Sequence, residues 1–141
     1  MEKDWEMKKI YQVIKDNYED AGQASRDIKN QLKAIGYDPK ILKRVSIACY
    51  EAEINLVIHS YGGTILFEID PEGIVHLSFD DTGPGIPDID KAMTPGWSTA
   101  SEKAREFGFG AGMGLDNMKN CATTFTISSS PEGTHLKMTF S

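Results

Sequence analysis

Several residue patterns that mark special classes of protein are missing from this sequence of 141 residues. It has only two cysteines, Cys49 and Cys121, and neither belongs to a CxxC pair or a metal-type spacing. We interpret both as small core residues rather than redox or metal-binding groups. No stretch approaches the roughly 18 uninterrupted apolar residues of a membrane helix, and the opening MEKDWEMKK has no apolar signal-peptide core. We therefore expect a cytoplasmic protein with no membrane partner.

A basic stripe is also missing. The formal net charge is −6, with 15 Lys and Arg against 21 Asp and Glu. This balance argues against a general nucleic-acid binder, which needs clustered cations for the phosphate backbone. It leaves a nucleotide ligand open, because backbone N–H groups and one or two cations suffice for a few phosphates. With 40% apolar and 26% charged residues, the composition is that of a globular protein, and we expect one domain over residues 1–141.

The spacing of apolar residues predicts five strands and three helices. In the first helix, Ala24, Ile28, Leu32 and Ile35 share one side, and Gly36 stops the helix. The order strand–helix–helix–strand–strand–loop–helix–strand–strand predicts an α+β two-layer sandwich, with a mixed, mostly antiparallel sheet and helices on one face. The expected strands are 10–15, 64–70, 73–80, 123–129 and 134–140, and the expected helices are 20–36, from near Pro39 to the glycines at 62 and 63, and from about 114.

The second helix carries a polar stripe beside an apolar face. Glu51, Asn55 and His59 recur every four residues, so their side chains align along a helix. A carboxylate, an amide oxygen and an imidazole in one line indicate a functional site. A helix with a few polar residues at its margin is the alternative. The expected core face consists of Ile47, Tyr50, Ile54 and Ile58.

A run of alternating glycines, EFGFGAGMGLDNM, occupies residues 106–118. A dinucleotide-binding fingerprint needs a strand directly before its glycines. The preceding residues here, TASEKAREF, are charged and helix-like, so that interpretation fails on its context. A phosphate cradle of another kind and a flexible turn both remain possible at this point.

A second glycine motif, FDDTGPGIPDI, begins where a predicted strand ends. Asp81 can accept a hydrogen bond from an amino group such as that of adenine. Gly83 would let a flat base approach the backbone, and Gly85 permits a tight turn. An ordinary surface turn explains the motif equally well. The stretch from 81 to 112 is much longer than a usual connection, which favours a lid.

Four motifs follow one another along the chain: E-x-x-x-N-x-x-x-H, D-x-G-P-G-I, G-x-G-x-G-L and a C-terminal G-T. Together and in this order, they resemble the N, G1, G2 and G3 boxes of the GHKL ATPase superfamily, with its Bergerat-type fold. The resemblance covers nearly the whole chain. Within the superfamily, the sequence is most similar to the small anti-sigma regulatory factors, which are switch-type serine protein kinases. The G-x-S-T tract at 96–99 resembles the stress-switch branch, where it lies in the lid, expected here at about 87–113.

The resemblance implies ATP and Mg²⁺ as ligands and a role for each matching residue. Glu51 would be the general base, Asn55 would bind Mg²⁺, Asp81 would bind the adenine amino group, and Thr134 would assist through water. Arg105 would stabilise the γ-phosphate as a second catalytic residue, although a solvated helix face explains it equally well. The implied nucleotide-binding set is Asn55, Asp81, Gly83, Gly85, Ile86, Ser98, Thr99, Gly108, Gly110, Gly112, Met113, Gly114, Leu115 and Thr134.

The resemblance also implies a function: an ATP-dependent serine protein kinase and anti-sigma regulatory factor of a bacterial partner-switching module. Its substrate would be a STAS-domain antagonist protein, its other partner a sigma factor or a phosphatase, and the chain could form a homodimer. The alternatives are a non-catalytic module whose nucleotide only gates the binding of a partner, and a free ATPase. Glu51 favours the kinase, because a pure binding protein needs no base there.

Overall fold

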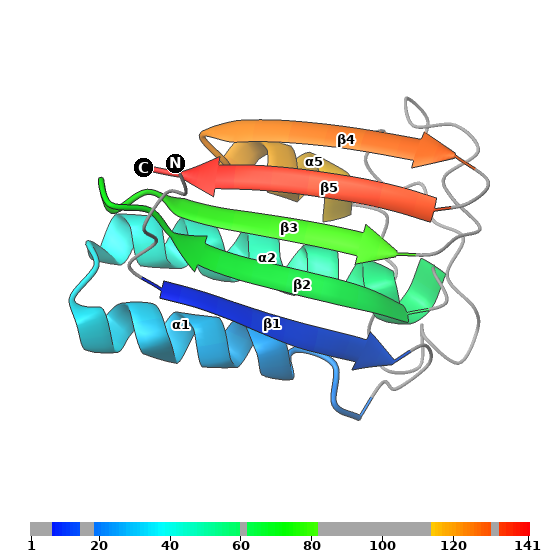
Figure 1. The fold of residues 1–141 in the computed structure, drawn as a ribbon, viewed down its shortest axis with the longest axis horizontal. Helices are drawn as coiled ribbons and strands as arrows, with labels where there is room; N and C mark the ends of the chain where they lie inside the picture. The colour runs from blue at the N-terminus through cyan, green and yellow to red at the C-terminus, as the bar shows by residue number, and fades with distance from the viewer. Residues whose placement is uncertain (1–6, 15–18, 60–61, 82–113, 131–132) are drawn as a thin grey trace, which may run out of the picture.

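The computed structural model describes residues 7–14, 19–59, 62–81, 114–130 and 133–141. Their order along the chain confirms the predicted succession of strands and helices (Figure 1). The elements are β1 (Met7–Ile14), α1 (Gln23–Ile35), α2 (Pro39–His59), β2 (Gly62–Ile69), β3 (Val75–Asp81), α5 (Gly114–Cys121), β4 (Thr124–Ser130) and β5 (Gly133–Phe140).

The strands form one five-stranded sheet in the order β1-β2-β3-β5-β4. Figure 1 shows α1, α2 and α5 together behind the sheet, so one face is covered and the other is open. This arrangement confirms the predicted α+β two-layer sandwich. All four strand pairs in the described residues are antiparallel, where we expected a mixed sheet.

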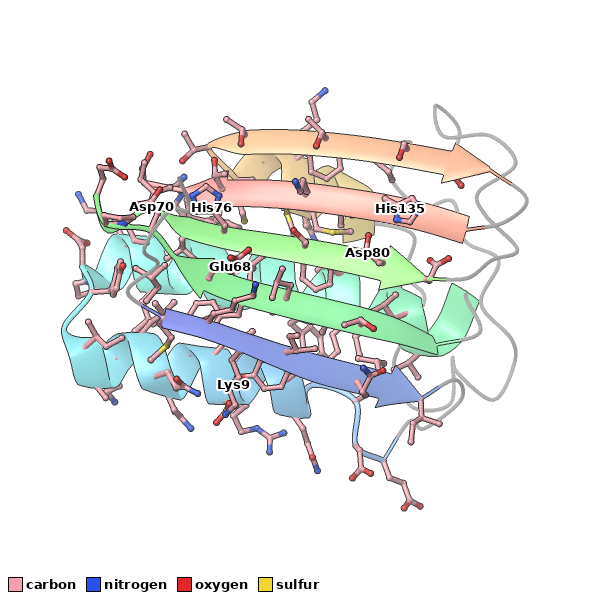
Figure 2. All side chains as sticks on the ribbon, viewed as in Figure 1. Lys9, Glu68, Asp70, His76, Asp80 and His135 are labelled. Atoms are coloured by element: carbon pink, nitrogen blue, oxygen red, sulfur yellow. The ribbon has the colours of Figure 1, made fainter. Side chains whose placement is uncertain are left out.

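The core lies between the sheet and the helical layer. Alternate residues of each central strand point into it, as the pleat of a strand requires: Val75, Leu77 and Phe79 of β3 are buried. Met118 anchors α5 in the same cluster. The opposite face is polar on β3 and β5, where Nδ1 of His135 lies 2.6 Å from Oδ1 of Asp80 (Figure 2), whereas Ile10 and Ile14 of β1 are exposed. The largest fully buried side chains are Phe67, Phe140, Ile28, Leu32, Ile65, Leu77, Met118 and Met138.

The predicted hairpin between β2 and β3 is confirmed, and a buried carboxylate organises it. Oδ1 of Asp70 accepts hydrogen bonds from the backbone N–H groups of Glu72 and Ile74, at 3.0 and 2.9 Å. Nε2 of His76 lies 2.8 Å from Oδ2 of Asp70. Burial alone raises the pKa of Asp70, but these hydrogen bonds, that of His76 first, outweigh it and leave the pKa lowered. The hydroxyl of Tyr37 donates to the carbonyl of Gly73 across 2.7 Å and fastens the turn to the helical layer.

The core face of α1 matches the prediction except at its end. Ala24, Ile28 and Leu32 are buried, and Gly36 stops the helix in the left-handed conformation (φ 101°), its N–H donating to Leu32. The prediction for Ile35 is wrong, because this side chain is 53% exposed. The i, i+4 row through Leu32 continues to Gly36, so Ile35 lies off that row in the last turn.

The predicted core face of α2 is largely wrong. Ile54 is buried, but Ile47 and Tyr50 are 37% and 39% exposed, and the side chain of Ile58 lies outside the described residues. The helix packs on the sheet and on both α1 and α5, so a wide part of its surface is buried, and this part is centred on residues other than the predicted ones. The buried residues there are Val45, Ala48, Cys49, Ala52, Leu56 and Val57.

The structure also bears on the two cysteines. Cys49 is fully buried, and burial raises the pKa of its thiol, as expected for a small core residue. Cys121 is half-buried against the core, and neither cysteine is in a disulfide. Among the described helices, none is both long and apolar enough to cross a bilayer.

Candidate functional site

The end of β3, the start of β2 and the last turns of α2 meet at one end of the sheet (Figure 1). Gly63 marks this contact, because it pairs with Asp81 across the strands. A Cβ placed on Gly63 would lie 2.3 Å from the carbonyl oxygen of Asp80 and 3.1 Å from Cδ2 of Leu56. Only glycine permits so close an approach. Asp81 therefore lies near the turn of α2 that carries Asn55.

The start of β5 lies against the same strand end. The backbone N–H of Thr134 donates a hydrogen bond to Oδ1 of Asp81 across 2.9 Å. The hydroxyl of Thr134 lies 2.8 Å from that of Ser129 on β4. Two predicted site residues, 53 positions apart in the sequence, are thus in direct contact, with Asp81 half-buried.

Glu51 and Asn55 are one turn apart on α2, and both are half-buried. Nδ2 of Asn117, on α5, lies 3.4 Å from Oε1 of Glu51. α5 begins at Gly114, the last glycine of the run, so this contact joins the predicted base to the helix that follows the predicted phosphate cradle. We did not predict Asn117 as a site residue. Its position on the first turn after the glycine run is the one sequence signal that could have indicated it.

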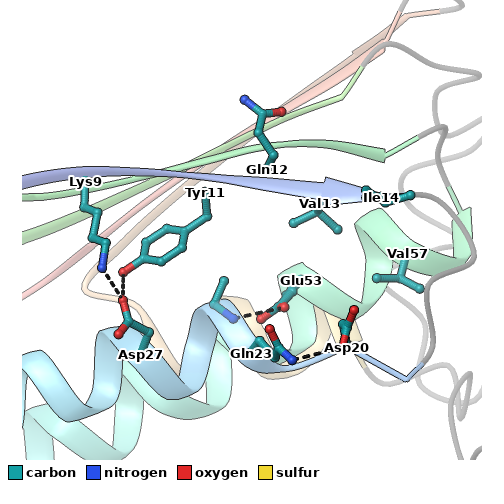
Figure 3. A pocket seen from close by; sticks show the side chains of 11 residues that line it. Lys9, Tyr11, Gln12, Val13, Ile14, Asp20, Gln23, Asp27, Glu53 and Val57 are labelled. Carbon is teal, nitrogen blue, oxygen red and sulfur yellow. Dashed lines mark hydrogen bonds and ion pairs between the residues drawn. The ribbon is translucent and has the colours of Figure 1, made fainter.

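Glu53, two residues further along α2, has a different environment. It is 3% exposed, and its carboxylate accepts hydrogen bonds from the backbone N–H groups of Gly22, Ala24 and Ser25 at 3.0, 3.3 and 2.9 Å. These are donors of the first turn of α1 that have no partner within the helix. The carboxylate also suits the positive end of the helix dipole. Glu53 therefore caps α1, and Figure 3 shows its side chain beside the start of that helix.

A pocket of about 530 Å³ lies between β1 and the start of α1, with Glu53 and Val57 of α2 in its wall (Figure 3). Asp27 accepts hydrogen bonds there from Lys9, at 2.7 Å, and from Tyr11. Lys9 above all lowers the pKa of Asp27, whereas burial and the bond to Asp27 raise that of Tyr11. Glu53, in the wall of this pocket, is two residues from both Glu51 and Asn55, and two residues along a helix correspond to about 200° of rotation. The pocket therefore lies on the side of α2 opposite to Glu51 and Asn55.

Comparison with known proteins decides the family. Residues 14–140 match the histidine kinase-like ATPase domain family. The chain belongs to this family. Among its relatives, the anti-sigma F factor of Bacillus licheniformis is 35% identical over 104 residues, which cover 70% of this chain and 68% of the relative. The serine/threonine-protein kinase RsbT of Bacillus subtilis is 31% identical over 113 residues, which cover 77% and 79%.

Two solved structures share the fold of this histidine kinase-like ATPase domain. A structure of the RsbU and RsbW domains of a Mycobacterium tuberculosis protein aligns with a TM-score of 0.60 at 18% identity, over 93% of this chain and 32% of that one. The SiaB–SiaC complex of Pseudomonas aeruginosa contains a chain that aligns with a TM-score of 0.52 at 14% identity, over 93% and 89%. At such identities the likeness supports the fold alone.

The structure describes only part of the predicted site of the ATPase domain. Glu51, Asn55, Asp81, Gly114 and Thr134 are described and come from four elements that adjoin at or near one end of the sheet. Leu115 is on α5, but its side chain is not described. The remaining predicted residues lie outside the described residues: Gly83, Gly85, Ile86, Ser98, Thr99, Arg105, Gly108, Gly110, Gly112 and Met113.

The described residues contain no group of three or more His, Cys, Asp or Glu side chains that could hold a metal ion. An ion at Asn55 would therefore need other oxygen ligands. Mg²⁺ suits such a site, because it is commonly held by one or two protein oxygens, by waters and by substrate phosphates.

Proposed function

We propose that this chain is an ATP-dependent serine protein kinase that phosphorylates a STAS-domain antagonist protein and holds a second partner, a sigma factor or a phosphatase. The observation that carries the proposal is the position of Glu51. This half-buried carboxylate shares a helix face with Asn55 and contacts α5, which begins at the last glycine of the run. The names of the relatives, an anti-sigma factor and a serine/threonine-protein kinase, support the same function.

In this proposal, the nucleotide lies across the end of the sheet and the first turn of α5. The carboxylate of Asp81 accepts a hydrogen bond from the adenine amino group, and Thr134 assists from the start of β5. Gly114 and the glycines before it offer N–H groups to the phosphates beside a helix N-terminus, where anions are stabilised. Asn55 would hold Mg²⁺ through its side-chain oxygen, and the ion would supply positive charge to the phosphates.

The chemical step is a phosphoryl transfer. The serine oxygen of the antagonist forms a bond to the γ-phosphorus of ATP while the bond from that phosphorus to the bridging oxygen breaks, and its electron pair leaves with ADP. The serine proton passes to the carboxylate of Glu51. The other carboxylate of this helix segment cannot serve, because Glu53 is buried with its oxygens held by α1. ATP as the substrate agrees with a location in the cytoplasm.

The test is an incubation of the purified chain with γ-labelled ATP, Mg²⁺ and a set of purified STAS-domain proteins, one at a time. We expect label on a serine of at least one of them. Label released only as free phosphate would indicate an ATPase. Nucleotide-dependent co-elution with a partner, without label, would indicate a binding module, and either result would contradict the kinase.

A further inference from the structure

We propose that Asn117 is the positioning residue of Glu51: its side-chain amide holds one carboxylate oxygen, so that the other faces the attacking hydroxyl. This inference rests on the proposed function, in which Glu51 is the base. It adds a residue on α5 to a catalytic apparatus otherwise placed on α2 and in the glycine run.

The position of Asn117 is fixed by its surroundings. The residue is half-buried, and the next one, Met118, is fully buried in the core. α5 therefore cannot turn without removing Met118 from the core. From this anchored turn, Nδ2 of Asn117 reaches to 3.4 Å from Oε1 of Glu51. Contacts of catalytic groups are often long in the free enzyme and shorten once the substrate is bound.

The chemistry of an amide suits this task. An asparagine N–H donates a hydrogen bond without adding a positive charge, so it orients the carboxylate without forming an ion pair that would reduce its basicity. In the part of the chain that the structure describes, Glu51 accepts a side-chain hydrogen bond only at Oε1. Oε2 is then the oxygen that receives the serine proton, while the bond from Asn117 to Oε1 persists before and after the transfer.

The helix also sets the distance between base and phosphate. Asn117 is three residues after Gly114, about 4.5 Å along the helix axis. The backbone N–H of Gly114, which is one of the proposed phosphate contacts, and the donor to Glu51 therefore belong to the same first turn of α5. Holding reactive groups within a fraction of an ångström is worth large factors in rate, and a misplacement of about 1 Å can cost roughly 100-fold.

The experiment compares Asn117→Ala, Asn117→Asp and Lys119→Ala with the wild type, using the STAS-domain protein that the wild type labels. Lys119 is exposed on the same helix and serves as the control. We expect kcat to fall about 10- to 100-fold in Asn117→Ala, with the Kd for ATP and the melting temperature close to wild type. Asn117→Asp has the same shape but repels Glu51, so it should lose at least as much kcat. Lys119→Ala should match the wild type.

A double mutant tests whether Asn117 acts through Glu51. Glu51→Ala with Asn117→Ala should be no slower than Glu51→Ala alone, because residues that act as one unit are not additive. Full kcat in Asn117→Ala, or an additive loss in the double mutant, would overturn the inference and leave the kinase intact. No transfer by the wild type to any STAS-domain protein would overturn the proposed function and the inference with it.

Discussion

The backbone N–H of Thr134 lies 2.9 Å from Oδ1 of Asp81, so the first residues of β5 hold the carboxylate at the end of β3. A carboxylate fixed at a strand end by a neighbouring backbone can recognise a ligand without first paying for its own ordering. This contact holds the carboxylate of Asp81 where the proposed nucleotide would need it.

The first prediction concerns base specificity. Adenine presents an amino group to Asp81 where guanine presents a carbonyl, so the wild type should prefer ATP over GTP by a factor of about 10⁴ or more. Asp81→Asn should weaken ATP binding about 10- to 100-fold and reduce the preference, because its amide can donate to guanine. Calorimetry measures both nucleotides. Asp80→Asn, at the exposed carboxylate that pairs with His135, is the matched control. Equal affinities for ATP and GTP in the wild type would remove Asp81 from this role.

Gly63 should tolerate no side chain. In Gly63→Ala, the new methyl group would lie 2.3 Å from the Asp80 carbonyl oxygen, so β2 and β3 must separate where Asp81 is held. We expect about 1–3 kcal/mol less stability and weaker ATP binding. Gly73→Ala is the control: its φ of 83° costs about 1–2 kcal/mol, but nothing lies nearer than 3.9 Å, and ATP binding should be unchanged. Urea unfolding and calorimetry separate the two effects, and normal ATP affinity in Gly63→Ala would contradict the geometry.

Glu53 and Glu51 should differ in what their removal changes. Glu53→Ala leaves the buried N–H groups of Gly22, Ala24 and Ser25 without an acceptor. Each unsatisfied buried donor costs about 1–3 kcal/mol, so we expect a loss of at least about 3 kcal/mol. Glu51→Ala, at a half-buried side chain, should change the free energy of unfolding by less than about 1 kcal/mol. Urea unfolding of both variants is the measurement, and similar losses would mean that Glu53 is no cap.

Asp70 should make stability depend on pH. Its pKa in the folded protein is lowered by hydrogen bonds, that of His76 first, which outweigh the effect of burial. A lowered folded pKa gives stability that is present above the unfolded value, about 3.9, and is lost as the pH falls through the folded value. Asp70→Asn should therefore be less stable than the wild type at pH 7, and its free energy of unfolding should fall less steeply below about pH 5, which we call the acid limb. Unfolding at a series of pH values tests this, and an unaltered acid limb would refute it.

The sequence predicted the order of the elements and the alignment of Glu51 with Asn55 on α2, but not which face of that helix is buried. Ile47 and Tyr50 are the larger side chains of one candidate face, and they are exposed. Ala48 and Ala52 belong to the face that is buried. Small side chains allow a helix to lie close to a sheet, so the face with Ala48 and Ala52 is the buried one. The pattern of a single helix does not contain this information, because it depends on the elements that pack against the helix.

Contacts across the chain were beyond prediction for a related reason. Glu51 and Glu53 are both acidic residues on one helix, and their different contacts give them different roles. The N-terminus of α1 contacts Glu53, whereas Asn117 contacts Glu51. Asn117 is 66 positions from Glu51 in the sequence, with nothing local to connect them. Asp81 was singled out by the glycine motif that follows it, which is a local signal, and Thr134 by the resemblance of the C-terminal G-T to the G3 box.

The central claim is that Glu51 accepts the proton in a phosphoryl transfer. The most direct test is a paired measurement on the wild type and Glu51→Ala: ATP affinity by calorimetry, and phosphorylation of the STAS-domain protein by gel shift. General-base assistance is worth about 10²–10⁴ in rate. We therefore predict that Glu51→Ala phosphorylates the STAS-domain protein more slowly by this factor, while its affinity for ATP stays within a few-fold of the wild type. Unimpaired phosphorylation by Glu51→Ala would contradict the account.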